Sequence, residues 1–214
     1  FAKNLSNIAH QLKTPITAIS LSAQMMEEHP SRDYLAQIHK QLGRLTHLEE
    51  ALLLLSRLDA GILPLKMEAV DVYTAVSLAA DNLQEVFEAA GLSVDISEMG
   101  EMKILADLDW TMEALMNLFK NCAEYTPPGG RIHCACSQNP LYTEIILWDE
   151  GKGFDKEDIP HLFERFYRGK NASGNGIGIG LSLAREIIER QNGTIRAVNL
   201  PGKGAAFEIR FYSH

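Results

Sequence analysis

A histidine, a threonine and a proline within six residues form the first group that could carry out chemistry. His10 lies on the polar side of a predicted helix, opposite the apolar stripe that a 3.6-residue period places on the other side. Thr14 follows one helical turn later on the same face, and Pro15 removes the backbone donor that would bond the Gln11 carbonyl. We therefore expect the helix to be loosened just after His10. An exposed imidazole offers a nucleophilic nitrogen, so His10 is a candidate acceptor in a group transfer.

The competing interpretation is that His10 is an ordinary surface histidine. Six others are available for that role, namely His29, His39, His47, His133, His161 and His214. A buried core histidine is the weaker alternative, because a core side chain would lie within the apolar stripe.

Two glycine-rich segments could bind a nucleotide. The segment 149–154, which begins with Asp149 and contains Gly151 and Gly153, follows a predicted strand. An aspartate there can accept a hydrogen bond from an exocyclic amine, and the glycines let a ring system approach the backbone. The alternative is an ordinary glycine-rich turn, which has the same residue types. The segment 176–181 leads into a predicted helix, whose free N–H groups attract phosphate. It lacks the ending of a P-loop, and no βαβ unit surrounds it, which excludes the Rossmann interpretation.

Asn117 and Asn121 lie four residues apart on one face of a helix predicted over residues 109–125. Asparagine is mildly unfavourable inside helices, so two on one face indicate a ligand more than a local preference. The alternative is a solvated helix face.

The elements that position these residues fall into two parts. Apolar residues recur every three or four positions through residues 1–60, and His29–Asp33 interrupts them as a turn, with Ser31 available as a helix cap. This pattern predicts an antiparallel helical hairpin. A hairpin with one stripe per helix cannot close a core alone, so we expect two copies to form a four-helix bundle in a homodimer. The alternative is that the hairpin packs on the rest of the chain.

Residues 61–67 contain Gly61 and Pro64 and are the expected linker, and residues 68–214 form the second domain. Helices are predicted over residues 72–90, 109–125 and 178–191. Strands are predicted over residues 92–97, 102–106, 131–137, 142–149, 194–199 and 205–212. Mostly antiparallel strands interspersed with helices indicate an α+β fold in the form of a two-layer α/β sandwich.

Composition excludes several classes of protein. The 214 residues are 46% hydrophobic and 22% charged, as in an ordinary globular chain. A net charge of −8 argues against a nucleic-acid partner. Three cysteines do not form an even disulfide set and indicate reduced thiols in the cytoplasm. No apolar run is long enough for a membrane helix. Because the chain begins at Phe1 inside a predicted helix, we expect a further segment upstream.

The motifs together resemble the cytoplasmic core of bacterial sensor histidine kinases. The segment 10–15 resembles their phospho-acceptor motif. The segments 117–125, 149–154, 163–166 and 176–181 resemble the asparagine, first glycine, phenylalanine and second glycine boxes of the ATPase superfamily that also contains gyrase, heat-shock chaperones and MutL. The segment 202–207 resembles the closing glycine segment. These motifs occur in family order over nearly the whole chain.

The resemblance implies a role for each matching residue. His10 would accept the phosphoryl group, and Gln11 and Thr14 would assist. Asn121 would bind Mg²⁺ at the ATP phosphates, with Asn117 beside it. Asp149 would read the adenine amine, Tyr125 would pack near the base, and Gly151 and Gly153 would keep the base pocket open. The residues implied at the phosphates are Arg165, Arg168, Lys170, Gly176, Gly178, Gly180 and Leu181. Lys170 begins the expected ATP lid, which Phe163 and Phe166 would anchor.

Three positions depart from the family pattern. Gln11 replaces the usual acidic residue after the acceptor, and an amide cannot take a proton at neutral pH. Glu124 replaces a frequent basic residue, and Ile177 a frequent threonine. These departures bear on the rate of autophosphorylation more than on which residue is the acceptor.

The sequence thus predicts a protein-histidine kinase that phosphorylates His10 from ATP and passes the group to an aspartate of a response-regulator receiver domain. Phosphatase activity toward the regulator would depend on Thr14. We expect a cytoplasmic portion of an inner-membrane sensor, with membrane contact only through upstream segments. The alternative is a weak kinase that serves mainly as an ATP-gated dimeric platform or phosphatase for its regulator. A chaperone-like or topoisomerase-like ATPase is disfavoured, because such enzymes need no acceptor histidine.

Overall fold

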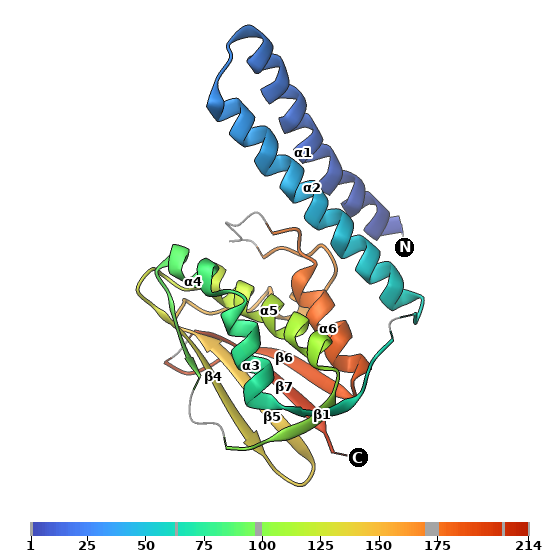
Figure 1. Ribbon diagram of the computed structural model, residues 1–214, viewed down its shortest axis with the longest axis vertical. Coiled ribbons are helices and arrows are strands. Elements are labelled where there is room, and N and C mark those ends of the chain that lie inside the picture. Colours follow the sequence, from blue (N-terminus) through green and yellow to red (C-terminus); the bar gives the residue numbers. More distant parts are fainter. Residues whose placement is uncertain (1, 63, 97–99, 170–175, 203, 214) are drawn as a thin grey trace. The chain divides into compact units, whose positions relative to one another are not determined.

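The chain forms two compact units, one built on two long helices and the other on a mixed sheet with its helices (Figure 1). The computed structural model describes residues 2–62, 64–96, 100–169, 176–202 and 204–213. Within these ranges, none of the helices combines the length and the hydropathy that crossing a bilayer requires.

The first unit is the predicted antiparallel hairpin of α1 (Ala2–Glu28) and α2 (Arg32–Asp59). Ser31 caps α2, because its side chain accepts a hydrogen bond from the backbone N–H of Asp33 at 3.2 Å. Across the hairpin, the Ser22 hydroxyl donates to the side-chain oxygen of Gln37 at 3.2 Å. This polar contact joins the two helices within a largely apolar interface.

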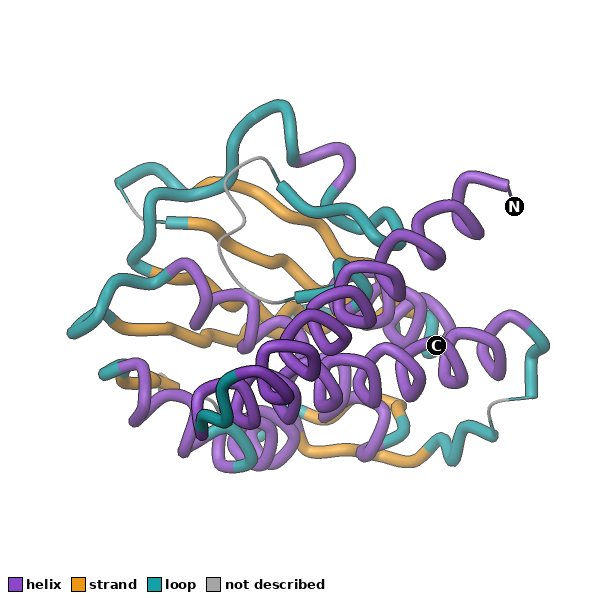
Figure 2. Tube along the Cα trace, turned by 90° about the horizontal axis from the view of Figure 1, so that it is seen from above, coloured by secondary structure: helices purple, strands orange, loops and turns teal. Residues whose placement is uncertain are grey.

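The second unit is an α+β sandwich. In chain order its elements are β1 (Glu68–Asp71), α3 (Val72–Asp81), α4 (Gln84–Ala90), β2 (Ser93–Ile96), β3 (Lys103–Ala106), α5 (Leu108–Tyr125), β4 (Arg131–Gln138), β5 (Tyr142–Asp149), the 3₁₀ turn η1 (Ile159–His161), α6 (Gly180–Arg190), β6 (Gly193–Asn199) and β7 (Ala205–Tyr212). The main sheet has the order β2-β4-β5-β7-β6, and β1 pairs with β3 in a separate two-stranded ribbon. Figure 2 shows the strands and helices as distinct layers of this unit.

Helices α3, α5 and α6 cover one face of the main sheet (Figure 1). Strand β5 alternates strictly, and its buried positions are Thr143, Ile145, Leu147 and Asp149. A strand points successive side chains to opposite faces, so the four buried residues point toward the helices. Asp149 is therefore the last residue of an otherwise mainly apolar row, at the carboxyl end of the strand.

The structure differs from the sequence prediction in one divided helix and one added strand. The helix expected over residues 72–90 is two helices, because the chain turns at Asn82 and Leu83; the Asn82 side chain bonds the Leu78 carbonyl at 2.8 Å, and Leu83 is buried. Strand β1 was not predicted. Strand β2 pairs with β4 in parallel, whereas the other pairs of the main sheet are antiparallel.

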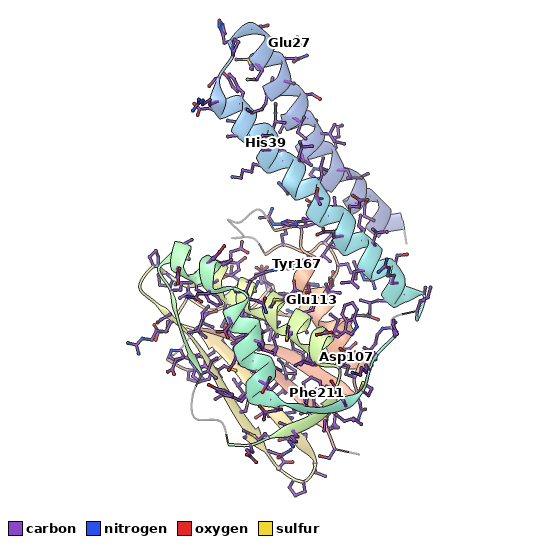
Figure 3. The ribbon with its side chains drawn as sticks, in the orientation of Figure 1. Glu27, His39, Asp107, Glu113, Tyr167 and Phe211 are labelled. Carbon is purple, nitrogen blue, oxygen red and sulfur yellow. The ribbon has the colours of Figure 1, made fainter. Side chains whose placement is uncertain are left out.

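The N-terminus of α5 is fixed by a buried carboxylate (Figure 3). Asp107 accepts from the backbone N–H of Trp110 at 3.1 Å and of Lys66 at 2.7 Å, and its own N–H donates to the Gln191 side chain at 2.6 Å. The residue is 7% exposed. Asp107 thus joins the segment before β1, the start of α5 and the end of α6.

We expect Asp107→Ala to lower the free energy of unfolding of this unit by about 2 kcal/mol, because it removes the cap of α5 and also the partly buried hydrogen bond from the Lys66 N–H. The matched control is Asp71→Ala at the more exposed cap of α3, where the loss should be about 1 kcal/mol. Urea unfolding of the two variants measures the difference, and equal losses would contradict the assignment.

Candidate functional site

His10 is exposed on α1, as predicted. The Thr14 hydroxyl lies one turn further on and donates to the His10 backbone carbonyl at 3.2 Å. Helix α1 continues through Pro15 without a break, and the proline is buried. Pro15 therefore has a packing role that its effect on backbone hydrogen bonding did not reveal.

The residue after His10 is held by the other helix of the hairpin. The Gln11 side-chain oxygen accepts from Nη2 of Arg44 on α2 at 3.2 Å. Within the described residues, the Arg44 Nε is buried and has no hydrogen-bond partner. Gln11 thus connects α1 to α2, a contact that the sequence did not indicate.

In the second unit, the end of β5 presents a buried carboxylate. Asp149 is 1% exposed, and its Oδ1 accepts from the backbone N–H of Gly151 at 2.8 Å and of Ala205 at 3.1 Å. Burial raises the pKa of the Asp149 carboxyl, and these two hydrogen bonds act in the opposite direction. The result is a sheltered acceptor whose position is set by the backbone.

Two glycines leave room for this carboxylate. A Cβ at Gly151 would lie 2.5 Å from the Tyr125 carbonyl and 2.9 Å from Asp149 Oδ1. A Cβ at Gly204 would overlap the same carboxylate. Gly204 is a site residue that the sequence reasoning passed over, although the closing glycine segment was the signal that could have found it.

Gly153 was predicted to border an open base pocket, but it lies against the Asn199 side chain. Its φ is +82°, and a Cβ there would meet the Asn199 side chain at 2.7 Å, so the space is filled by protein. Asn199, at the end of β6, accepts from the Phe154 N–H at 2.7 Å and donates to the Phe154 carbonyl at 2.8 Å. This two-point contact fixes the first glycine segment, and no pattern in the sequence pointed to Asn199.

The asparagine face of α5 lies against the start of α6. The Asn117 amide nitrogen donates to the backbone and side-chain oxygens of Glu113 at 2.8 and 3.1 Å. A Cβ at Gly180 would lie 2.8 Å from the Asn117 amide oxygen. Asn121, one turn further along, is partly buried. The structure therefore brings Asn117 and Gly180 together.

Tyr125, at the end of α5, is partly buried, and burial is the main cause that raises the pKa of its hydroxyl. The charge of Arg168 opposes this rise. The nearby Tyr167 hydroxyl donates to Asp158 at 2.7 Å, which raises the pKa of Tyr167 to about 12. Tyr125 and Arg168 are thus electrostatic neighbours.

The other predicted phosphate-binding residues lie between β5 and α6. Arg165 faces Glu186 of α6, with Nη2 and Oε2 4.0 Å apart, and Phe163 packs edge-on against Phe207 of β7. Gly176 is exposed, Gly178 has a φ of +77°, and Leu181 is partly buried in the first turn of α6. Helix α6 begins at Gly180, two residues later than predicted. Lys170 lies outside the described residues.

The donors present suit Mg²⁺ better than a softer metal. Among the described residues, no group of three or more His, Cys, Asp and Glu side chains could hold a metal ion. Mg²⁺ in nucleotide sites takes one or two protein oxygens, several waters and the phosphates. The nitrogen of the Asn117 amide is bonded to Glu113, so its oxygen is directed toward Gly180. The Asn117 amide oxygen is therefore a donor of the kind that such an ion takes.

Two family models match the chain. The model described as "His Kinase A (phospho-acceptor) domain" matches residues 2–61. The model described as "Histidine kinase-, DNA gyrase B-, and HSP90-like ATPase" matches residues 106–213.

Known proteins of this kind resemble the chain over nearly its whole length. The sensor protein SphS of Synechococcus elongatus is 32% identical over 216 residues, which cover 95% of this chain and 52% of SphS. The chain thus spans about half the length of the curated relatives it matches. Histidine kinase AdeS of Acinetobacter baumannii has a similar fold, with a TM-score of 0.79, 24% identity, and coverage of 95% of this chain and 97% of that one. Histidine kinase ThkA, solved in complex with the response regulator TrrA, gives a TM-score of 0.78 at 19% identity, over 99% of this chain and 61% of that one.

We expect Gly204→Ala to lower the unfolding temperature of the second unit by several degrees, since the new Cβ displaces the Asp149 carboxylate from its buried hydrogen bonds. Gly100→Ala is the matched control, because a Cβ there meets nothing within 4 Å. Thermal unfolding followed by circular dichroism measures both. Equal unfolding temperatures for the two variants would mean that Gly204 does not constrain Asp149.

Proposed function

The chain belongs to the histidine kinases, and from this we propose that it transfers the γ-phosphoryl group of ATP to His10 and then to an aspartate of a response regulator. The observation that carries the proposal is the buried, glycine-flanked Asp149 carboxylate, an adenine-type acceptor, in the same chain as an exposed histidine. Either feature alone would be ambiguous.

The adenine end of ATP would bind beside β5 and α5. Asp149 would accept a hydrogen bond from the exocyclic amine, because its carboxylate is held by two backbone donors on one oxygen. Gly151 would let the base approach, and Tyr125 would pack near it. Burial makes such a hydrogen bond selective, because a sheltered acceptor left unpaired is costly.

The phosphate end would lie near α5 and the start of α6. Asn121 would hold Mg²⁺, with Asn117 beside it, and the bound ion would neutralise charge on the phosphates. Gly176, Gly178, Gly180 and Leu181 would supply backbone at the phosphates. Arg165, Arg168 and Lys170 would supply positive charge. The pair between Arg165 and Glu186 is long and partly exposed, so this contact itself contributes little.

In the transfer step, the Nε2 lone pair of His10 attacks the γ-phosphorus. An N–P bond forms while the bond from phosphorus to the bridging oxygen breaks, and ADP leaves with that electron pair. The imidazole must then lose its other proton. Gln11 cannot take it, and its amide oxygen is bonded to Arg44. Because position 11 supplies no base for this proton, we expect slow autophosphorylation.

The hairpin would form a homodimer through its apolar face. Leu12 and Ile16 of α1 are 37% and 51% exposed in the single chain. With Leu45, Leu52 and Leu53 of α2 they line a groove of about 490 Å³. A second hairpin is the partner that would bury these side chains in a four-helix bundle.

The regulator would dock on the hairpin near the phosphorylated histidine. ThkA, whose fold is similar, was solved with its response regulator, which supports a partner of this class. The chain would act as the cytoplasmic part of a membrane sensor, joined to it through segments upstream. Thr14, exposed beside His10, is the residue we assign to a phosphatase reaction on the regulator.

A second candidate function is favoured by the contact between Gln11 and Arg44. Position 11 has an amide in place of a carboxylate, and Arg44 engages that amide. The chain could therefore serve mainly as an ATP-gated dimeric platform or phosphatase for its regulator. The two functions differ in whether label from ATP enters the protein while ATP and the regulator still bind.

We expect γ-labelled ATP with Mg²⁺ to label the wild type, in a form that is acid-labile and alkali-stable, because the phosphoryl group is on nitrogen. His10→Gln should reduce labelling to background. The matched control His39→Gln removes another exposed histidine of the hairpin and should label as the wild type does. Labelling of His10→Gln would overturn the assignment of the acceptor, and ATP binding without any label would favour the platform.

A further inference from the structure

His133 lies on the face of the sheet opposite the helices. Its neighbours in β4, Ile132 and Cys134, are fully buried on the helix side, and the strand alternates. The imidazole stacks on Trp148, its partner in β5, with the ring centroids 5.0 Å apart and the planes 11° from parallel. Only 16% of the His133 side chain is exposed. The ring is therefore held in a fixed plane.

In that plane, each ring nitrogen meets a carboxylate. Nε2 lies 3.0 Å from Oε1 of Glu150, and Nδ1 lies 3.3 Å from Oδ2 of Asp95 on β2. A neutral imidazole has one N–H and can donate to one of them, whereas the imidazolium donates to both. Stacking on Trp148 also favours the charged ring. The number of hydrogen bonds from His133 to these two carboxylates therefore depends on one proton.

Glu150 connects His133 to the base site. It directly follows Asp149, and its Oε2 accepts from the backbone N–H of Arg131 at 3.0 Å. The hydrogen bond from His133 is the largest cause that lowers the pKa of the Glu150 carboxyl, followed by that from the Arg131 backbone. The charged groups around the imidazole are thus Asp95 from β2, Glu150 from the end of β5, and Arg131 from β4 through Glu150.

We propose that His133 is a positioning residue for ATP: through Glu150 it holds the turn from Asp149 to Gly151, and it holds this turn more tightly when protonated. The inference rests on the proposed ATP site. With a proton on each ring nitrogen, His133 donates to Glu150 in the turn and to Asp95 on β2, and so links the turn to β2. When the ring is neutral, one nitrogen presents a lone pair to a carboxylate, and that link is lost.

ATP affinity should therefore fall as the pH rises and the His133 imidazole loses a proton. Asp149 acts in the opposite direction at lower pH, because it must be ionised to accept from the base. The carboxylates of Asp95 and Glu150 are about half exposed, so the effect of His133 should be about threefold in affinity rather than larger.

The first test needs no nucleotide. Two-dimensional ¹⁵N–¹H NMR of the whole chain follows the Gly151 amide from pH 5.5 to 8.5, beside the ring signal of His133. We expect the amide to shift with the same midpoint as the ring in the wild type and to lose that transition in His133→Gln. An amide that keeps the transition in His133→Gln, or never shifts with the ring, overturns the positioning role.

The second test measures binding of Mg²⁺-ATP by calorimetry over the same pH range. Wild type should bind about threefold more weakly at pH 8 than at pH 6, beyond any change seen in His133→Gln. Asp95→Asn, which lies outside the base turn, should reduce the pH dependence as well. The control His47→Gln removes an exposed histidine that pairs with Glu50 on α2 and should keep the wild-type profile.

The outcomes separate the two proposals. Equal pH profiles for wild type and His133→Gln contradict the inference while ATP binding itself stands. Failure of wild type to bind ATP at any pH contradicts the proposed function, and the Gly151 titration then still decides whether His133 positions the turn.

Discussion

The second unit depends on one constraint, the need to satisfy a carboxylate that the strand pattern places in the interior. Asp149 falls on the buried face of β5 because the strand alternates, and a buried carboxylate is costly unless it is hydrogen-bonded. The two donors are backbone N–H groups from segments far apart in sequence, which approach only because residues 151 and 204 lack a Cβ. The glycine segments thus position an acceptor as much as they leave space for a ligand.

The hairpin meets a different requirement, because its acceptor must stay accessible while its neighbours pack. His10 is exposed and Pro15 is buried on the same helix, and Gln11 reaches across to Arg44. Gln11 stands where the family pattern has an acidic residue, and its side chain is here part of the contact between the two helices. The chain thus keeps the acceptor histidine exposed and has no base at position 11.

The sequence predicted those features that depend on periodicity or on glycine. The hairpin, the paired strands β4 and β5, and the position of an aspartate at a strand end all follow from apolar spacing. The contacts of Asn199 with Phe154 and of Gln11 with Arg44 were missed, because they join residues 45 and 33 positions apart with no local signal. The break at Asn82 was missed because both sides of it keep a helical period. Tertiary contacts decided each of these.

The most direct test of the account is the affinity of the wild-type chain for Mg²⁺-ATP against Mg²⁺-GTP, measured by calorimetry at one pH. Adenine presents an amine where guanine presents a carbonyl oxygen. A sheltered carboxylate at Asp149 accepts from the amine and repels the oxygen, so ATP should bind at least about tenfold more tightly. Equal affinities would contradict the claim that this buried carboxylate reads the base.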